Sequence, residues 1–191
     1  MKKNRYGQAR VLDSNQLDLL IDYLPSNFHK TLATCLRRSG ARVSEVCKLK
    51  WENLEKDFLL FPSRICKRKL TSREIPIELD FYNLMMNWKQ DWTILKGRQP
   101  LGNDYIFFGR FEGSCINSRS FMYALESAAR EANLIGVSSH SFRRSALSEA
   151  SRKKIPLRVL QSLSGHKNLG TLQKYLEITD KDKREGARAF A

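Results

Sequence analysis

Residues 140–175 read HSFRRSALSEASRKKIPLRVLQSLSGHKNLGTLQKY, and this stretch decides how the chain is interpreted. It holds two of the chain's three histidines and the adjacent pair Arg143 and Arg144, and it ends at Tyr175, nine positions after His166. An arginine guanidinium stays charged and can bind two phosphate oxygens at once. A tyrosine phenol can act as a nucleophile when neighbouring groups assist it, since its ordinary pKa is about 10. The stretch therefore indicates phosphate chemistry with a candidate nucleophile.

His140 and Arg143 are three positions apart, so in a helix they would share one face and could converge on one group. The alternative interpretation is structural. In that case the stretch is a basic amphipathic helix pair whose charges face solvent and whose apolar residues pack a core, namely Phe142, Leu147, Val159, Leu160 and Leu163. For any one of the candidate site residues taken alone, such as a single histidine or tyrosine, the structural interpretation is favoured.

A second segment far upstream changes that balance. Residues 39–49 read SGARVSEVCKL, with Arg42 between a glycine and a Ser-Glu pair. Taken together, the two segments resemble the tyrosine site-specific recombinases, or phage-type integrases. In that family a first catalytic arginine lies in Gly-x-Arg-x-Ser-Glu-Leu, a second lies in His-x-x-Arg, and a histidine in Leu-Gly-His precedes the nucleophilic tyrosine by nine residues. The matching positions here are Arg42, His140, Arg143, His166 and Tyr175.

The family also carries a lysine in a β-hairpin between the first two motifs. Residues 66–77 read CKRKLTSREIPI and resemble that hairpin, with residues 74–77 as the returning strand. Lys67 is the candidate, and Lys69 is the second choice. A solvated basic turn is the alternative for this segment taken alone.

The chain departs from the family pattern in two small ways and one large way. Ser164 stands where an apolar residue usually precedes Gly-His, and Thr171-Leu172 stands where Thr-Thr is common. Neither change removes a chemical group from the expected site. Most integrases carry a helical core-binding domain ahead of this one, whereas only about ten residues precede the resemblance here. We therefore expect a short recombinase or a catalytic fragment.

Composition agrees with one domain over residues 1–191 that binds a polyanion. The formal net charge is +14 over 191 residues, which favours a polyanion partner without separating DNA from RNA or an anionic membrane.

No apolar run approaches the roughly 18 residues of a membrane span, and the start of the chain lacks a signal peptide's apolar stretch. We expect a cytoplasmic, nucleoid-associated protein. An RNA-binding role is disfavoured, because no aromatic-basic motif of the usual RNA modules is present.

Neither cysteines nor carboxylates indicate a metal site. The four cysteines, at positions 35, 47, 66 and 115, never form Cys-x-x-Cys and are expected as reduced thiols in or near the core. Asp57, Asp80 and Asp104 stand apart, unlike the carboxylates of a two-metal nuclease. We expect no cofactor and no metal.

The coarse pattern predicts an α+β chain that is mainly α, with a helical bundle and a small three-stranded antiparallel sheet. The strands are expected at residues 58–61, 63–67 and 73–77. Asp13 and Gln16 resemble a capping box, a helix over about 30–39 should end at Gly40, and Tyr175 should lie on a short helix. Residues 179–191 read as a flexible tail or as one that docks on a neighbouring protomer.

The resemblance implies a DNA strand-exchange enzyme that needs neither ATP nor metal. Tyr175 would attack the scissile phosphate and leave a 3′-phosphotyrosine and a 5′-hydroxyl. Arg42, Arg143 and His166 would bind the phosphate, Lys67 would protonate the departing 5′-oxygen, and His140 would assist proton transfer at Tyr175. The partner would be double-stranded DNA, bound by a homo-oligomer, expected as a tetramer, on paired sites. The alternatives are a non-catalytic DNA-binding regulator on the same fold and a relaxing type IB topoisomerase.

Overall fold

The computed structural model describes residues 8–66, 71–178 and 180–188 of the chain. Helices dominate it, as predicted for a mainly α member of the α+β class. The α-helices are α1 Ser14–Asp22, α2 Asn27–Ser39, α3 Val43–Val46, α4 Leu79–Lys96, α5 Ser118–Glu131, α6 Ser139–Arg152, α7 Leu157–Ser164, α8 Leu169–Gln173 and α9 Asp180–Arg188, with a 3-10 turn η1 Trp51–Asn53.

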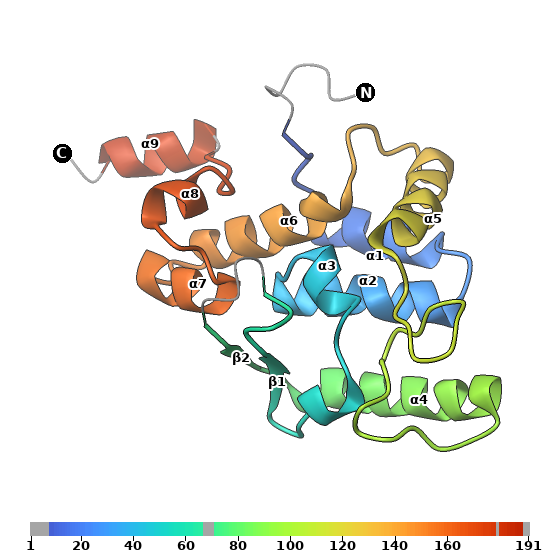
Figure 1. The fold of residues 1–191 in the computed structure, drawn as a ribbon. Coiled ribbons are helices and arrows are strands. Elements are labelled where there is room, and N and C mark those ends of the chain that lie inside the picture. The colour runs from blue at the N-terminus through green and yellow to red at the C-terminus, as the bar shows by residue number, and fades with distance from the viewer. Residues whose placement is uncertain (1–7, 67–70, 179, 189–191) are drawn as a thin grey trace.

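Helix α2 occupies the centre of the molecule. It packs against α6 on one side and α4 on the other, with α1 and α3 beside it (Figure 1). Leu32, Ala33, Cys35 and Leu36 on this helix have no exposed surface. Because α2 is buried on several sides, it fixes the relative positions of α3 and α6, the two helices that carry the motifs around Arg42 and Arg143.

Local signals set the ends of these helices. Asp13 and Gln16 form the predicted capping box, with Gln16 N donating to Asp13 Oδ1 at 2.8 Å and Asp13 N donating to Gln16 Oε1 at 3.3 Å. Helix α2 begins at Asn27, three residues before the predicted start, and ends at Gly40, whose φ of 58° is left-handed. That reversal leads directly into Arg42 at the start of α3.

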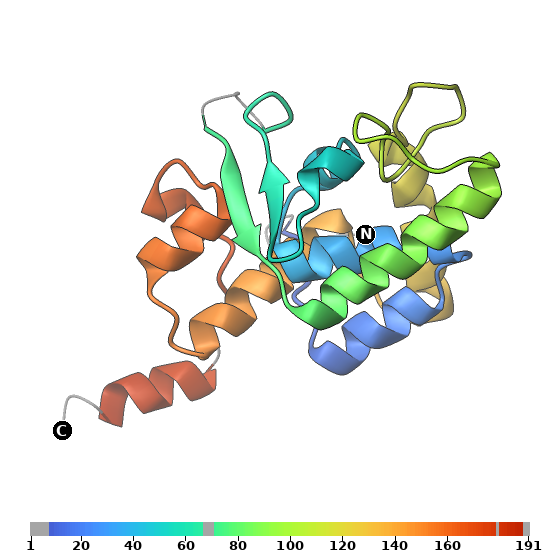
Figure 2. The same cartoon turned by 90° about the horizontal axis from the view of Figure 1, so that it is seen from below.

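The sheet has two strands in the described residues, not the three predicted. Strand β1 Phe58–Phe61 pairs antiparallel with β2 Arg73–Pro76, and Phe61 lies opposite Arg73. The strand expected at residues 63–67 is wrong as far as residue 66, because the chain turns after Pro62. Ile65 N donates to Pro62 O at 3.0 Å and Cys66 N donates to Ser63 O at 3.1 Å. Figure 2 shows the two strands standing between the α7–α8 side of the molecule and α3.

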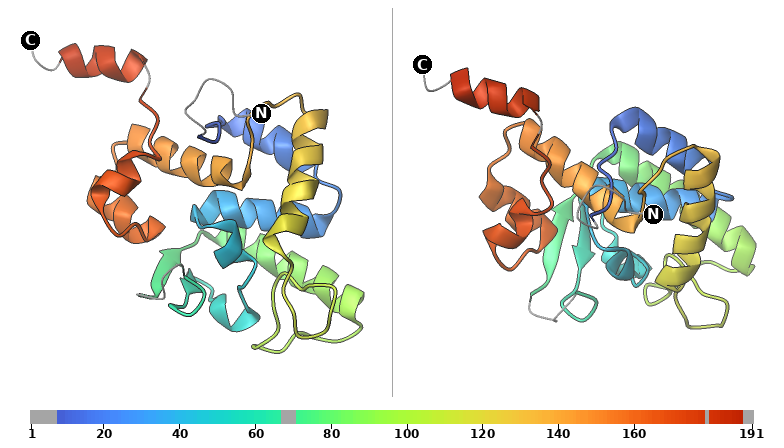
Figure 3. Two further views of the ribbon diagram at one scale, coloured as in Figure 1. Left: turned by 45° about the horizontal axis from the view of Figure 1, so that its top comes forward. Right: turned by 90° about the horizontal axis from the view of Figure 1, so that it is seen from above.

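A second, smaller core holds the C-terminal helices. Leu147 of α6, Leu160 of α7 and Leu172 of α8 are buried together, apart from the main cluster. Pro156 precedes α7, and Gly165 ends it with a left-handed φ of 65°. Of the tail, residues 180–188 form α9, which lies next to α8 in Figure 1 and projects from the body of the molecule in Figures 2 and 3. Among the described residues, no helix is both long and apolar enough to cross a membrane.

Candidate active site

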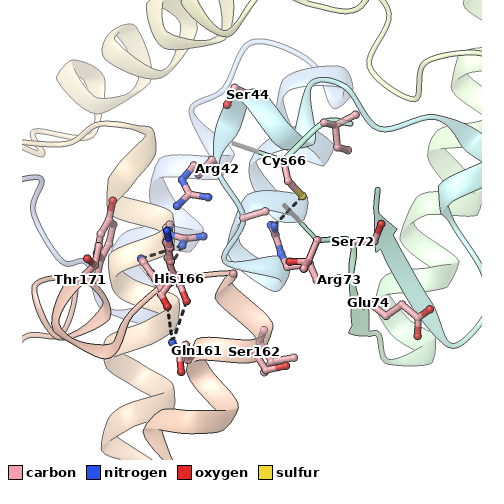
Figure 4. A pocket seen from close by; sticks show the side chains of 18 of the residues that line it. Arg42, Ser44, Cys66, Ser72, Arg73, Glu74, Gln161, Ser162, His166 and Thr171 are labelled. Carbon is pink, nitrogen blue, oxygen red and sulfur yellow. Dashed lines mark hydrogen bonds between the residues drawn. The ribbon is translucent and has the colours of Figure 1, made fainter. Parts of the chain in front are cut away.

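A cleft of about 1930 Å³ opens between the β1–β2 hairpin with α3 on one side and α6, α7 and α8 on the other. Five of the six predicted site residues line it: Arg42, His140, Arg143, His166 and Tyr175. Figure 4 looks into this cleft, where Arg42, Arg73 and His166 are labelled. The sixth, Lys67, and its alternative, Lys69, lie outside the described residues.

Arg143 is the centre of the cluster, with 0% of its surface exposed. It donates from Nη1 to Gly40 O at 2.7 Å and from Nη2 to Ser164 O at 2.8 Å. Both carbonyls belong to left-handed helix ends, at the last residue of α7 and at the glycine cap of α2. Burial and the nearby Arg42 lower the pKa of Arg143 to about 10, so it stays charged at neutral pH. Its Nε is buried and has no partner in the part of the chain that the structure describes.

His166 follows Gly165 and is 5% exposed. Its Nδ1 lies 2.7 Å from Ser164 Oγ, and Arg143 Nη2 lies 3.1 Å from its Nε2. Burial first, and then Arg143 and Arg42, lower the pKa of His166 to about 3. The imidazole is therefore neutral, and one of its ring nitrogens accepts from Arg143.

Glu45 is a site residue that the sequence interpretation did not include. It is fully buried and accepts from Arg42 Nη1 at 2.8 Å on one oxygen and from Arg73 Nη2 at 2.6 Å on the other. Burial alone would raise the pKa of Glu45, but Arg73 and then Arg42 lower it to about 2. The carboxylate is ionised and holds two guanidinium groups at the edge of the cleft.

Arg73 was also missed, because the sequence placed it only in a predicted strand. Its Nη1 lies 3.4 Å from Cys66 Sγ, and its guanidinium lies 4.5 Å from the centre of the Phe61 ring. A Cβ at Gly165 would lie 3.2 Å from Arg73 Nη1, so the hairpin and the end of α7 are in close contact. The only local feature that could have pointed to Glu45 was its position three residues after Arg42, which allows an ion pair between the two side chains. Nothing in the sequence pairs Glu45 with Arg73, 28 positions away.

The described part of the cluster thus holds three arginines, Arg42, Arg73 and Arg143, against one carboxylate, Glu45. Like charges in the interior are costly unless an anion joins them. The excess positive charge faces the cleft and makes it a site for an anion such as a phosphate.

Tyr175 reaches this cluster from a turn. Helix α8 ends at Gln173, so the prediction that Tyr175 lies on a helix is wrong by two residues. The backbone N–H of Tyr175 donates to Leu172 O at 2.8 Å in the turn that follows the helix. The centre of the tyrosine ring lies 4.8 Å from that of His166 and 5.4 Å from Arg143 Cζ. The His140 ring lies 6.3 Å away. The tyrosine ring therefore lies beside the Arg143 cation and the two histidines of the cleft.

No group of three His, Cys, Asp or Glu side chains gathers as metal ligands would in residues 8–66, 71–178 and 180–188. The expectation of a metal-free site stays a prediction. The four cysteines are free, three of them buried and Cys115 half-buried. Burial raises the pKa of Cys47 to about 12, which agrees with inert core thiols.

The fold and the cleft together define a helical domain with a buried arginine cluster, a neutral histidine and a tyrosine around one anion site. Residues 10–182 match the sequence model of the phage integrase family, and the chain belongs to that family.

Curated relatives carry the name of tyrosine recombinases. The chain is 27% identical over 182 residues to Tyrosine recombinase XerA of Pyrococcus furiosus, covering 92% of this chain and 60% of the relative. It is 25% identical over 175 residues to Tyrosine recombinase XerC of Xanthomonas axonopodis pv. citri, covering 88% and 54%. The chain therefore spans little more than half the length of these relatives.

Solved structures share the fold. The crystal structure of XerA recombinase superposes with a TM-score of 0.77 at 17% identity, covering 95% of this chain and 65% of that chain. XerH site-specific recombinase bound to palindromic difH substrate, in a post-cleavage complex, gives a TM-score of 0.77 at 21% identity, over 97% and 54%. The catalytic domain of bacteriophage HP1 integrase gives 0.65 at 14% identity, with 95% of each chain covered.

Proposed function

We propose that this chain is the catalytic domain of a site-specific DNA recombinase that works through a covalent tyrosine intermediate. The observation that carries the proposal is the position of Tyr175, with its ring 4.8 Å from His166 and 5.4 Å from Arg143 in an anion-binding cleft. The family membership supports it, and so does the XerH structure, which contains a DNA substrate. The net charge of +14 favours the same partner.

The proposed reaction is a balanced exchange at phosphorus. The Tyr175 oxygen forms a bond to the scissile phosphorus, and the bond from phosphorus to the 5′-oxygen breaks. The 5′-oxygen takes a proton from Lys67, and His140 takes the phenol proton. A 5′-hydroxyl of the partner strand then attacks the phosphotyrosine and releases Tyr175. Because one phosphodiester bond is made for each one broken, the exchange needs no ATP.

Arg42 and Arg143 have the role of binding the non-bridging phosphate oxygens. Arg143 supports this role because its buried Nε lacks a partner among the described residues, and an unsatisfied buried donor is costly until an acceptor arrives. A preorganised donor of this kind contributes about 10²–10³ in rate, since it stabilises charge that builds in the transition state. His166, neutral beside Arg143, adds a hydrogen bond.

The test is a nicked duplex that carries the protein's binding site, selected from random DNA or from repeats flanking the gene. The nick releases a short strand after cleavage and traps the adduct. We expect a protein–DNA band that survives denaturing electrophoresis and forms in the presence of EDTA. Tyr175→Phe should bind the DNA as the parent does and form no adduct, whereas the control Tyr123→Phe, at an exposed site, should form it normally.

Four outcomes would contradict the proposal. An adduct with Tyr175→Phe would assign the nucleophile to another residue. Strict dependence on magnesium would indicate a nuclease mechanism. Specific binding with no adduct from the parent would favour a DNA-binding regulator, and relaxation of supercoiled plasmids without site preference would favour a topoisomerase.

A further inference from the structure

The Tyr175 segment is held to α6 by its backbone. Arg144 Nε donates to Tyr175 O at 3.4 Å, and Ser148 Oγ donates to the same carbonyl at 3.4 Å. Ser148 Oγ also accepts from Glu177 N at 3.0 Å. These two side chains lie one helical turn apart on α6, so the main chain of the tyrosine is fixed to the helix that also carries Arg143.

A second segment is held to the same helix by the same arginine. We call residues 9–12 the N-terminal strap. Arg144 Nη1 donates to Ala9 O, and Leu12 N donates to Ser145 Oγ at 2.8 Å. Arg10 N donates to Gly136 O at 2.9 Å, just before α6. Figure 3 shows the strap running beside α6, with the segment that follows α8 near the other end of that helix.

Arg144 is 7% exposed, and Ala9 and Ser145 are 5% and 3% exposed. A guanidinium in such an environment is stable only when its donors meet acceptors, because water cannot replace them. Two of those acceptors are backbone carbonyls from opposite ends of the chain. If Ala9 O moves away, Arg144 Nη1 loses an acceptor, and we expect the guanidinium to reorient and its contact with Tyr175 O to lengthen.

We propose that Arg144 is a positioning residue that couples the N-terminal strap to Tyr175, so that the tyrosine is in place only while the strap lies on α6. Arg144 does not touch the phosphate in this arrangement; it acts through the backbone of the nucleophile. Any partner or conformational change that lifts the strap would thereby switch off strand cleavage. The inference rests on the proposed function for its consequence, but the coupling itself is a property of the free protein.

The coupling is tested without DNA by fluorine NMR of the full chain labelled with 3-fluorotyrosine. Tyr175→Phe assigns the Tyr175 signal among the six tyrosines. Ser145→Ala removes a strap contact and leaves Arg144 intact, and faster amide exchange at Leu12 would verify that the strap is loosened. We expect Ser145→Ala and Arg144→Lys to move the Tyr175 signal in the same direction. Ser151→Ala, the same change at another position of α6, should leave it in place.

Cleavage of the nicked duplex supplies the second measurement. Arg144→Ala should lower the rate of adduct formation by about 10- to 100-fold with DNA affinity unchanged, as expected for a small misplacement of a reacting group. Arg144→Lys should restore part of the rate, since an ammonium can reach one carbonyl but not both; it also serves if the alanine variant does not fold. Arg130→Ala, which removes an exposed charge from α5, is the control.

The coupling is overturned if Ser145→Ala loosens the strap while the Tyr175 signal stays at its parent position. It is also overturned if folded Arg144→Ala cleaves at the parent rate. A parent protein that forms no adduct would instead refute the proposed function, and the NMR measurement would still decide whether the strap and Tyr175 are coupled.

Discussion

At the scale of single residues, Arg143 determines how the cleft is built. It carries a full charge with no exposed surface, and its two backbone acceptors come from Gly40 and Ser164. Removing a guanidinium from water is costly, so these carbonyls must be held in place. The left-handed caps of α2 and α7 hold them. The same caps deliver Arg42 and His166 to the cleft, which links backbone geometry directly to the proposed phosphate site.

The two arginines give a first prediction at this scale. Arg42→Ala and Arg143→Ala should each lower cleavage by about 10²-fold or more while DNA is still bound, because the donors act on the transition state. Arg42→Lys and Arg143→Lys should restore little, since an ammonium cannot make the two-pronged contact. Adduct formation on the nicked duplex measures the rate, and Arg119→Ala in α5 is the charge control. Near-parent cleavage by either lysine variant would exclude the bidentate role.

His166 gives a prediction about stability and pH. Its pKa is about 3 in the folded chain against an ordinary 6.5, because burial and then Arg143 and Arg42 disfavour its charged form. Between those values the unfolded chain binds a proton that the folded chain does not, so stability falls as pH falls through this window. One such group contributes about 1.4 kcal/mol per pH unit in the middle of the window.

The measurement is urea unfolding of the parent and of His166→Gln between about pH 5 and pH 6.5, above the range in which Glu45 titrates. The parent should lose unfolding free energy more steeply with acid than the variant. Equal slopes would mean that the pKa of His166 is the same in the folded and unfolded chains, and the lowered pKa of the buried imidazole would then be wrong.

The sequence predicted the site residues that belong to recognisable motifs. It missed the residues whose role depends on contacts between distant parts of the chain. Arg42, His140, Arg143, His166 and Tyr175 were identified because they match the motifs of the resembled family, and all five line one cleft. Glu45 and Arg73 form a buried ion pair at 2.6 Å that joins α3 to β2. Such a pair depends on how the hairpin packs against α3, which no local pattern encodes.

At the scale of elements, helix caps were predictable and the hairpin was less so. Capping residues act on their own neighbours, which is why the Asp13 box and the glycine end at Gly40 were predicted correctly. The predicted strand at residues 63–67 was wrong as far as residue 66, because the chain turns after Pro62 at the end of β1. Residues 63–66 nevertheless have a strand-like composition. The β1–β2 pair is short, and its position depends on contact with α7.

That contact yields a prediction with a matched control. Gly97 and Gly165 both end helices with left-handed φ, 66° and 65°. An alanine at either position should lose about 1–2 kcal/mol to backbone strain. At Gly97 the added Cβ would meet nothing within 4 Å, whereas at Gly165 it would approach Arg73 Nη1 to 3.2 Å. We therefore expect Gly165→Ala to be the more destabilised variant in urea unfolding.

The two variants should also differ in activity. Gly165→Ala should lower adduct formation on the nicked duplex, because His166 follows the strained residue and Arg73 supports Glu45. Gly97→Ala should cleave at the parent rate. If the two variants lose the same free energy and both cleave normally, the close contact between the hairpin and α7 does not support the cleft.

At the scale of the whole molecule, the site lies where two cores meet. The large core around α2 carries Arg42, and the small core of Leu147, Leu160 and Leu172 supports the segment that carries Tyr175. Beyond them α9 projects from the body (Figures 2 and 3), with an acidic first turn and Arg188 in its last turn. We expect a polar helix that extends from its own domain to make contacts with a neighbouring protomer. The resemblance to the integrase family implies the same for residues 179–191. The sequence had left this segment open between a flexible tail and a docking element.

The last prediction concerns this helix and the assembly of protomers on DNA. We expect a chain that ends at Ile178 to bind a single site nearly as well as the parent, because α9 lies outside the cleft. The same chain should form fewer complexes of several protomers on DNA that carries paired sites, since α9 is the segment proposed to dock on a neighbour. Mobility-shift titrations on one-site and two-site DNA, at several salt concentrations, separate the two effects. The part of the affinity that comes from phosphate contacts falls as salt rises. Docking of α9 adds a protein–protein contact, which only two-site DNA can report. Unchanged higher-order complexes after removal of α9, or an equal loss of binding on both DNAs, would assign protomer contacts to another surface of the domain.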